Sequence, residues 1–290
     1  MSRQGRLREP KTRAARPTSV RLRMRHRLLL LALSAVVVAP LVHCGPEPRA
    51  PQPPPAGTPR LRVMTFNVNF GVSTEPENLA AIRTSGVDVV LLQETTAATE
   101  RSFRRELADL YPHMRFRACC RAGGLGILSR HPIVEDEWIE SDVGWFPAWR
   151  FVVHAPIGEV QLLDVHLRPP VSDSGSWVAG YVSTGPFRLQ EIATFSSSLR
   201  TDLPTIVAGD FNENERGDAI DWLEAKGYTS ALPQFDANAM TWQWALPLAT
   251  LRARLDHIMV GPGLVAHAAA VIEAGRSDHW PVVAEVTAER

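Results

Sequence analysis

The chain has 290 residues, of which 45% are hydrophobic and 21% charged, and these are ordinary values for a globular protein with a sizeable core. Its net charge of zero hides an uneven distribution, because residues 1–43 hold ten Lys and Arg against one acid, Glu9. The remainder holds 21 basic and 30 acidic residues, a formal net charge of −9. A domain this acidic lacks the basic surface of a tight nucleic-acid binder and fits better with cation binding, or with a substrate whose phosphate is met by a metal.

The N-terminal residues 1–43 have the pattern of an export signal. Leu28–Val42 is an apolar run too short for a comfortable membrane span, and it follows a series of arginines that ends at Arg27. A true start at Met24 would give this signal normal proportions. We therefore predict that the chain is exported.

The end of the apolar run, Leu41-Val42-His43-Cys44, resembles the lipobox of bacterial lipoproteins, in which the cysteine becomes the lipidated N-terminus. This resemblance predicts lipidation at Cys44, attachment to a membrane through a lipid anchor, and a place in the periplasm or on the outer membrane or cell surface.

Residues 44–59 are predicted to be a proline-rich tether, since seven prolines lie between Pro46 and Pro59. Such a segment is expected not to pack and favours an extended polyproline II backbone of about 3.1 Å per residue, which would hold the domain some tens of ångströms from the anchor. Residues 60–290 are then compatible with one α/β domain.

The first half of this domain alternates between strands and helices, and two of its strands end in polar residues. Strands are expected over residues 61–66, 87–92 and 123–130, and helices over 77–84 and about 98–110. The first strand stops at Asn67 and the second at Glu94, and the glycines of the third indicate close backbone approach. The adjacent Cys119 and Cys120 can pair only through a strained ring and lack metal-ligand spacing, so we assign them no role.

The second half repeats the pattern of buried strands that stop at polar residues. We expect a hairpin over residues 148–154 and 159–167, a loop over 171–186, a helix over 187–199, a strand over 204–208, a helix over 218–225, a loop carrying Trp242 and Trp244, and strands over 254–260 and 282–286. His166 ends the hairpin, Asp210 and Asn212 follow the next strand, and Asp256, Asp278 and His279 flank the last two.

The polar residues at these strand ends form one candidate site: Asn67, Glu94, His166, Asp210, Asn212, Asp256, Asp278 and His279. Carboxylate and amide oxygens suit a hard cation, Mg²⁺ first and Mn²⁺ or Ca²⁺ as alternatives, and Mg²⁺ keeps waters and substrate phosphate oxygens in its shell. Two histidines supply a group that takes a proton from water and a group that stabilises charge or protonates a leaving oxygen. The set therefore indicates a metal-dependent hydrolase.

Seven short motifs in order resemble the endonuclease/exonuclease/phosphatase family over nearly all of residues 60–290. They are Thr65-Phe66-Asn67, Leu92-Gln93-Glu94, the Gly-x-Gly-Ile-Leu-Ser-Arg run at 124–130, His166-Leu167, Gly209-Asp210-Phe211-Asn212, Leu255-Asp256-His257-Ile258 and Ser277-Asp278-His279-Trp280-Pro281-Val282. The resemblance implies a four-layer α/β/β/α sandwich, in which two packed mixed β-sheets are flanked by helices, with the site at one edge. It also implies Mg²⁺-dependent cleavage of a phosphoester.

The same resemblance implies a role for each site residue. Glu94 is expected to be the main metal ligand, with Asn67 and Asp278 near the metal. Asp210 and Asn212 are expected to orient water and phosphate, and His279, held by Asp256, to act as general base. His166 is expected to stabilise the transition state or serve the leaving group.

Departures from one branch of the family narrow the expected substrate. Asn69 and Ala122 stand where abasic-site endonucleases carry Asp and Tyr, and those enzymes also lack a histidine at the place of His166. The chain thus resembles the branch of deoxyribonucleases, sphingomyelinases and inositol phosphatases. We expect a monomeric phosphodiesterase or nuclease, with a lipid phosphodiesterase or an inositol or sugar phosphatase as the alternative; the substrate would be nucleic acid, phospholipid or inositol phosphate. A non-catalytic binding lipoprotein is the least favoured hypothesis, because no member of the set is missing.

Several residues near these motifs admit two readings. Asn69 is either metal-associated or a turn residue, and the turn is favoured. His257 is expected to face away from the site, Arg130 to form an ion pair, and Arg168 to bind substrate phosphate through bidentate geometry. The tryptophans expected in loops could stack on a base or dip into lipid, although packing beneath long loops is favoured for any one of them.

Overall fold

The computed structural model describes residues 47–289, and two packed six-stranded sheets form the centre of this part of the chain. The predicted signal segment and Cys44 lie outside the described residues. No helix among residues 47–289 combines the length and the apolar composition needed to cross a bilayer.

The first sheet is mixed and has the strand order β13-β14-β1-β2-β4-β3. β1 runs parallel to β2, whereas the other neighbours are antiparallel. Its strands are β1 (Leu61–Asn67), β2 (Val89–Gln93), β3 (His113–Arg117), β4 (Leu125–Ser129), β13 (Leu264–Val271) and β14 (Val282–Ala288).

The second sheet is also mixed and has the order β5-β6-β7-β8-β12-β9. Its one parallel pair is β7 with β8, and the expected hairpin of β6 and β7 is confirmed. Its strands are β5 (Ile133–Ile139), β6 (Ala148–Ala155), β7 (Gly158–His166), β8 (Thr205–Asp210), β9 (Thr229–Ser230) and β12 (Asp256–Val260).

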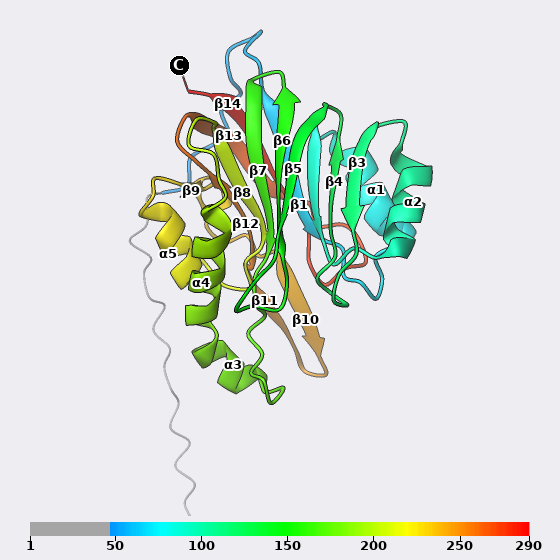
Figure 1. Ribbon diagram of the computed structural model, residues 1–290, viewed down its shortest axis with the longest axis vertical. Helices are drawn as coiled ribbons and strands as arrows, with labels where there is room; N and C mark the ends of the chain where they lie inside the picture. The colour runs from blue at the N-terminus through cyan, green and yellow to red at the C-terminus, as the bar shows by residue number, and fades with distance from the viewer. Residues whose placement is uncertain (1–46, 290) are drawn as a thin grey trace, which may run out of the picture. The chain divides into compact units, whose positions relative to one another are not determined.

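Helices cover the outer face of each sheet (Figure 1). The helices α1 (Pro76–Ser85) and α2 (Ala97–Leu107) lie on the first sheet, and α4 (Gly185–Ser196) and α5 (Asp218–Glu224) lie on the second. The remaining elements are α3 (Trp177–Ser183), the 3-10 turn η1 (Leu232–Gln234), and the strands β10 (Trp242–Leu246) and β11 (Ala249–Ala253). The predicted four-layer α/β/β/α sandwich is confirmed.

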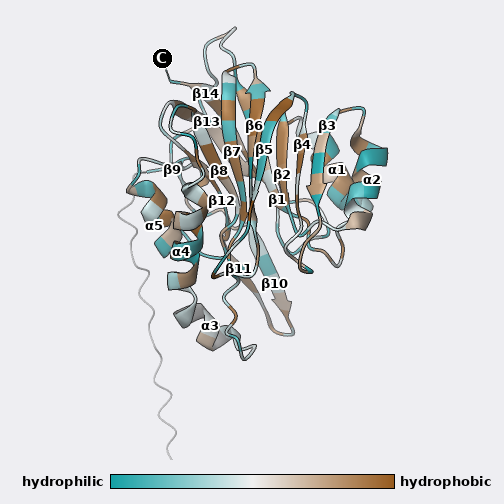
Figure 2. Ribbon diagram, viewed as in Figure 1, coloured by the Kyte–Doolittle hydropathy of each residue, from teal (hydrophilic) through white to brown (hydrophobic). Residues whose placement is uncertain are grey.

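Alternation along the central strands fills three hydrophobic cores. In β1, Leu61 and Val63 face the other sheet, whereas Met64 and Phe66 face the helices. Because successive side chains of a strand point to opposite faces, one apolar strand serves two layers at once. Figure 2 shows the resulting brown centre of both sheets, and burial of each large side chain stabilises the fold by about 1.5–3 kcal/mol.

Several elements differ from the sequence-based expectations. The loop expected around Trp242 and Trp244 is instead the hairpin of β10 and β11, and the loop expected over residues 171–186 contains α3. The strands β3 and β5 were not expected, because they lie at sheet edges and carry many charged residues, so they show no apolar run.

The expectation that the proline-rich tether does not pack is wrong for the part that the structure describes. The Arg49 backbone N–H donates to the Gln234 carbonyl at 2.8 Å, and the Gln52 N–H donates to the His267 carbonyl at 3.1 Å. The Arg49 guanidinium also lies 4.9 Å from the centre of the Phe235 ring. A polyproline backbone makes no internal hydrogen bonds, so its remaining polar groups are free to pair with a neighbouring surface.

Cys119 and Cys120, to which we assigned no role, form a disulfide in the loop between β3 and β4. Cys120 and the following Arg121 both have positive φ, 39° and 64°. This small ring therefore fixes an uncommon backbone path immediately before Ala122.

The glycines before and within β4 allow the close backbone approach that their sequence pattern predicted. A Cβ on Gly124 would lie 2.0 Å from the Thr95 carbonyl oxygen, next to Glu94. A Cβ on Gly126 would instead meet ring atoms of the half-buried Phe116 at 2.8 and 3.0 Å, and the Arg115 carbonyl oxygen only at 3.3 Å. The closest neighbour at Gly126 is therefore a side chain that can shift, whereas the closest neighbour at Gly124 is backbone.

We predict that Gly124→Ala lowers the free energy of unfolding by about 1–3 kcal/mol, as overpacking against a fixed backbone does. Gly126→Ala is the matched control and should cost less, because the Phe116 ring can shift. Urea denaturation of both variants measures the difference. Equal losses would contradict this account of the Gly124 contact.

Candidate functional site

The strand topology places the predicted polar residues at one edge, where the two sheets meet. The parallel pairs β1/β2 and β7/β8 bring their carboxyl ends to this edge. In the second sheet, His166 is in register with Asp210, and Asp210 is in register with Asp256. Residues that are far apart in the sequence therefore share a small volume.

One carboxylate oxygen, Asp210 Oδ2, lies at the centre of this group. The Asn67 Nδ2 group donates to it at 3.0 Å, and the Nε2 atoms of His166 and His279 each lie 3.6 Å from it. Burial raises the pKa of Asp210, while the charge of His279 acts in the opposite direction. The Asn212 N–H donates to the other oxygen, Oδ1, at 2.9 Å and fixes the rotation of the carboxylate.

The Asn212 backbone takes a left-handed conformation, with φ 52°, which asparagine adopts more readily than most residues. Its side-chain Nδ2 donates to the Leu167 carbonyl at 2.9 Å, directly after His166. Asn212 thereby links the ends of β7 and β8, and its positive φ is the kind of backbone strain that clusters at functional sites.

His279 and Asp256 form a buried pair. The His279 Nδ1 lies 2.9 and 3.0 Å from the two oxygens of Asp256, so it carries the hydrogen and leaves Nε2 facing Asp210. The Thr241 hydroxyl donates to Asp256 at 2.6 Å. Burial alone lowers the pKa of His279, but the charges of Asp256 and Asp210 outweigh it and raise the pKa to about 10.

His166 has the opposite electrostatic balance. Its Nδ1 lies 3.3 Å from the Ala122 carbonyl, which can only accept, so Nδ1 carries the hydrogen and Nε2 faces Asp210. The Phe146 ring covers the imidazole at a centroid distance of 4.4 Å. Burial lowers the pKa of His166 more than the nearby Asp210 charge raises it, so this histidine is neutral at pH 7.

Glu94 and Asp278 form the outer side of the site. Glu94 has φ 60° and accepts from Asn67 Nδ2 and from the Phe70 N–H, each at 3.0 Å. Burial raises the pKa of Glu94, while these two hydrogen bonds lower it. Asp278 accepts from Asn69 Nδ2 at 2.7 Å and from the Trp242 indole N–H at 3.1 Å.

The donor set of this edge fits a hard divalent cation. Glu94 and Asp210 are anions whose burial makes their charged form costly, and a cation among carboxylates offsets that cost. In this arrangement Asn67 directs its N–H₂ group at both carboxylates while its oxygen accepts the Asn69 N–H, so it separates the two anions and does not offer its oxygen to a metal.

A second set of possible ligands consists of Asp210, Asp256 and His279, each of which offers an atom within 4.8 Å of the others. A cation held there would compete with the bonds that join Asp256 to His279 and Thr241. Binding at the predicted ligands Glu94 and Asp278 would leave this buried pair intact.

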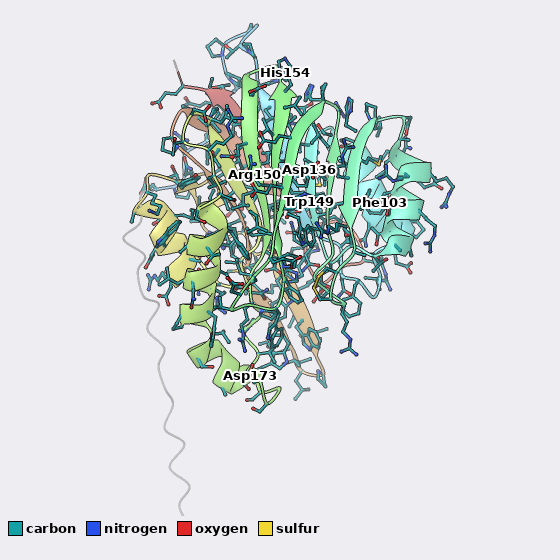
Figure 3. The ribbon with its side chains drawn as sticks, in the orientation of Figure 1. Phe103, Asp136, Trp149, Arg150, His154 and Asp173 are labelled. Atoms are coloured by element: carbon teal, nitrogen blue, oxygen red, sulfur yellow. A yellow bond between two sulfur atoms is a disulfide. The ribbon has the colours of Figure 1, made fainter. Side chains whose placement is uncertain are left out.

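Other residues singled out in the sequence fall into clear places. Asn69 lies in a turn, with φ 51°, and also holds Asp278, so both of its readings have a basis. His257 is buried on the far side, against the Glu213 carbonyl at 2.9 Å, and Arg130 lies 3.7 Å from Asp88. The Arg168 guanidinium packs between the Trp145 and Phe187 rings and pairs with Asp173, which Figure 3 labels beside α3.

Two positioning residues escaped the sequence analysis. Thr241 receives the Asp256 backbone N–H at 3.1 Å while it donates to the Asp256 carboxylate. The Ser277 hydroxyl donates to the Asn67 carbonyl at 2.7 Å and accepts the His279 N–H at 3.1 Å, so it joins the two sides of the site. Ser277 lies within the family motif at residues 277–282, so the sequence contains a signal for it. Thr241 lies in none of the motifs and has no such signal.

The sequence matches the model of the Endonuclease/Exonuclease/phosphatase family over residues 64–279. No curated protein sequence matches the chain.

Solved structures share the fold at low sequence identity. An endonuclease/exonuclease/phosphatase from Beutenbergia cavernae has a TM-score of 0.62 and 20% identity, covering 79% of this chain and 72% of that chain. D. rerio TDP2, complexed with single strand DNA product, has a TM-score of 0.61 and 18% identity, covering 79% and 99%. ANGEL2, a 2',3'-cyclic phosphatase in complex with adenosine-2',3'-vanadate, has a TM-score of 0.64 and 13% identity, covering 80% and 96%.

We predict that, in protein freed of divalent cations, the His279 imidazole stays protonated at pH 8 and titrates near pH 10. Since the unfolded pKa is about 6.5, this group contributes stability that is fully present below that pH and is lost as the pH rises toward the folded value. Imidazole ¹⁵N NMR measures the titration, and Asp256→Asn should lower the pKa because it removes the charge that raises it most.

The neighbouring His257 is an internal control, because burial lowers its pKa to about 4 and it should stay neutral over the same range. A His279 pKa at or below the usual value would show that the carboxylates do not control its protonation.

Proposed function

The chain belongs to the endonuclease/exonuclease/phosphatase family, whose members are phosphoester hydrolases, and from this membership we propose that it is a phosphodiesterase that depends on a divalent cation. The observation that supports this best is the grouping of Asn67, His166 and His279 around one oxygen of Asp210. Hydrolysis of a phosphodiester needs an oriented water, a proton acceptor and a group that faces the leaving oxygen. The two imidazoles and the carboxylate can meet these needs within one small volume.

The residues divide the work by position. Asp210 and Asn212 orient the attacking water, and His279 Nε2 takes its proton once the imidazole is neutral. Asp256 holds His279 in the tautomer whose Nε2 is free, because Nδ1–H points at the carboxylate. The neutral His166 faces the same oxygen of Asp210 as His279 does, and it serves the developing charge or the leaving oxygen.

When bound at Glu94 and Asp278, a cation such as Mg²⁺ supplies Lewis-acid polarisation of a phosphate oxygen. The protein's own contribution is to hold these carboxylates in place. Asn67 and the Phe70 N–H fix Glu94, and Asn69 and Trp242 fix Asp278. Neutralising part of the carboxylate field would also lower the pKa of His279 toward the range in which a base works.

The comparisons leave two classes of phosphodiester substrate open. TDP2 is described in complex with single strand DNA product, and ANGEL2 is described as a 2',3'-cyclic phosphatase. Both descriptions support a nucleic-acid diester as the substrate. The formal charge of −9 outside residues 1–43 disfavours tight binding to a long polyanion and favours a smaller diester, such as a lipid headgroup. Activity measured on plasmid DNA, sphingomyelin and inositol phosphates under one set of conditions separates these classes.

The apolar run Leu28–Val42 and Cys44 further support export and a lipid anchor. We expect metabolic labelling with palmitate in a bacterial host to mark the full chain, and we expect Cys44→Ser to abolish the label. Equal labelling of the variant would place any lipid elsewhere.

We predict Mg²⁺-dependent release of p-nitrophenol from bis(p-nitrophenyl) phosphate and loss of activity on chelation. His279→Ala should lower kcat by about 10²–10⁴-fold, the usual contribution of a general base, and Glu94→Ala should raise the Mg²⁺ concentration needed for half-maximal rate.

His154→Ala is the matched histidine control. His154 is exposed and lies near the upper end of β6 in Figure 3. It is in strand register with Glu159 near the start of β7, whereas His166 lies at the other end of β7. It should keep the parental rate. Parental activity in both site variants would refute the assignment of this site.

A further inference from the structure

The hairpin of β10 and β11 stands apart from the two large sheets. Its strands form a separate two-stranded sheet with a five-residue register, from Trp242 opposite Ala253 to Leu246 opposite Ala249. Figure 1 shows the hairpin extending beyond the strand ends that carry the site. A two-stranded hairpin has marginal stability in water, so one whose residues 244–252 are all exposed is suited to a further contact.

The projecting part of this hairpin is apolar and uncharged. Residues 242–251 read WQWALPLATL and include no charged residue. Leu248 at the turn is 100% exposed, and Trp244, Leu246 and Leu251 are 45–50% exposed. Contiguous exposed apolar residues mark interaction surfaces, because leaving them in water has a free-energy cost that a partner removes.

Positive charge lies at the base of the hairpin. Arg252 is exposed directly after the apolar run, and its guanidinium lies 6.0 Å from the centre of the Trp280 ring. Arg276 is also exposed, and it lines a groove together with Trp244 and Asp278. An apolar tip followed by tryptophan and then arginine matches the order of hydrocarbon, interface and phosphate in a bilayer leaflet.

The hairpin is joined directly to the candidate site. The Trp242 indole donates to Asp278, and the Trp242 backbone forms a β-bridge with His279. Whatever the tip contacts is therefore held close to the groove that Asp278 lines.

We propose that the β10–β11 hairpin docks on a phospholipid bilayer and inserts Leu246 and Leu248 into it, so that the site meets phosphodiesters of lipid headgroups at the membrane surface. The part of this inference that concerns substrate rests on the proposed function, whereas the docking itself does not. A lipid surface fits better than a second copy of the chain, because a narrow ribbon with a fully exposed tip penetrates a soft layer but offers little flat area to another protein.

The test uses the chain from Gly45 onward, a single compact unit that contains all three hydrophobic cores. Its binding to vesicles of phosphatidylcholine and phosphatidylglycerol is measured by co-sedimentation. The double variant Leu246→Asp/Leu248→Asp should bind at least about tenfold more weakly, since charge replaces apolar side chains that enter the leaflet. Val134→Asp, at an exposed valine of the edge strand β5, is the matched control and should bind like the parent.

Measurements of hydrolysis distinguish the docking proposal from the proposed function. The double variant should hydrolyse soluble bis(p-nitrophenyl) phosphate at the parental rate but lose turnover of phospholipid in vesicles. Vesicle binding by a parent that hydrolyses neither substrate would refute the proposed function and leave the docking surface supported.

Two results would overturn the docking proposal. One is parental vesicle binding by the double variant. The other is a parent that sediments as a dimer and a double variant that sediments as a monomer, which would make the hairpin an interface between copies.

Discussion

The whole site depends on one carboxylate oxygen placed where two β-sheets meet. Asp210 Oδ2 meets Asn67 and His279 from the first sheet, where His279 precedes β14, and His166 on β7 from the second sheet. Parallel pairing of β7 with β8 brings His166 beside Asp210, and the packing of the two sheets brings Asn67 to the same point. A shift of one residue in either register would turn these side chains to the opposite face, so the hydrophobic alternation that fills the cores also determines the geometry of the chemistry.

Electrostatics at this point gives two histidine side chains opposite protonation preferences. His279 lies among Asp256, Asp210 and Asp278, which favour its charged form, whereas His166 lies under Phe146 and beside a carbonyl. Of the two imidazoles that face Asp210, that of His279 is therefore favoured in the protonated form and that of His166 in the neutral form. Pairs of titratable groups whose surroundings drive their pKa values apart are typical of acid and base assignments in hydrolases.

Sequence patterns predicted an α/β domain and the set of strand-end residues because both arise from local rules, whereas the four-layer sandwich was implied by the resemblance to the family. An apolar strand that stops at Asn67, Glu94 or Asp210 is visible in the chain itself. The β10–β11 hairpin was taken for a loop because Pro247 breaks it and no face of it is buried in a core. Thr241 was missed because its importance lies in a contact with Asp256, fifteen residues away, that only the folded backbone creates. The packing of Arg49 on the domain was missed for the same reason.

The disulfide between Cys119 and Cys120 makes the orientation of His166 depend on the redox state of the compartment in which the protein folds. The ring precedes Ala122, whose carbonyl accepts from His166 Nδ1 and selects its tautomer. A host with a reducing cytosol would deliver the chain with this loop open and the imidazole less firmly oriented. Recombinant preparations should therefore be compared only after their thiol content has been matched, because oxidation of this pair sets the backbone that leads to Ala122.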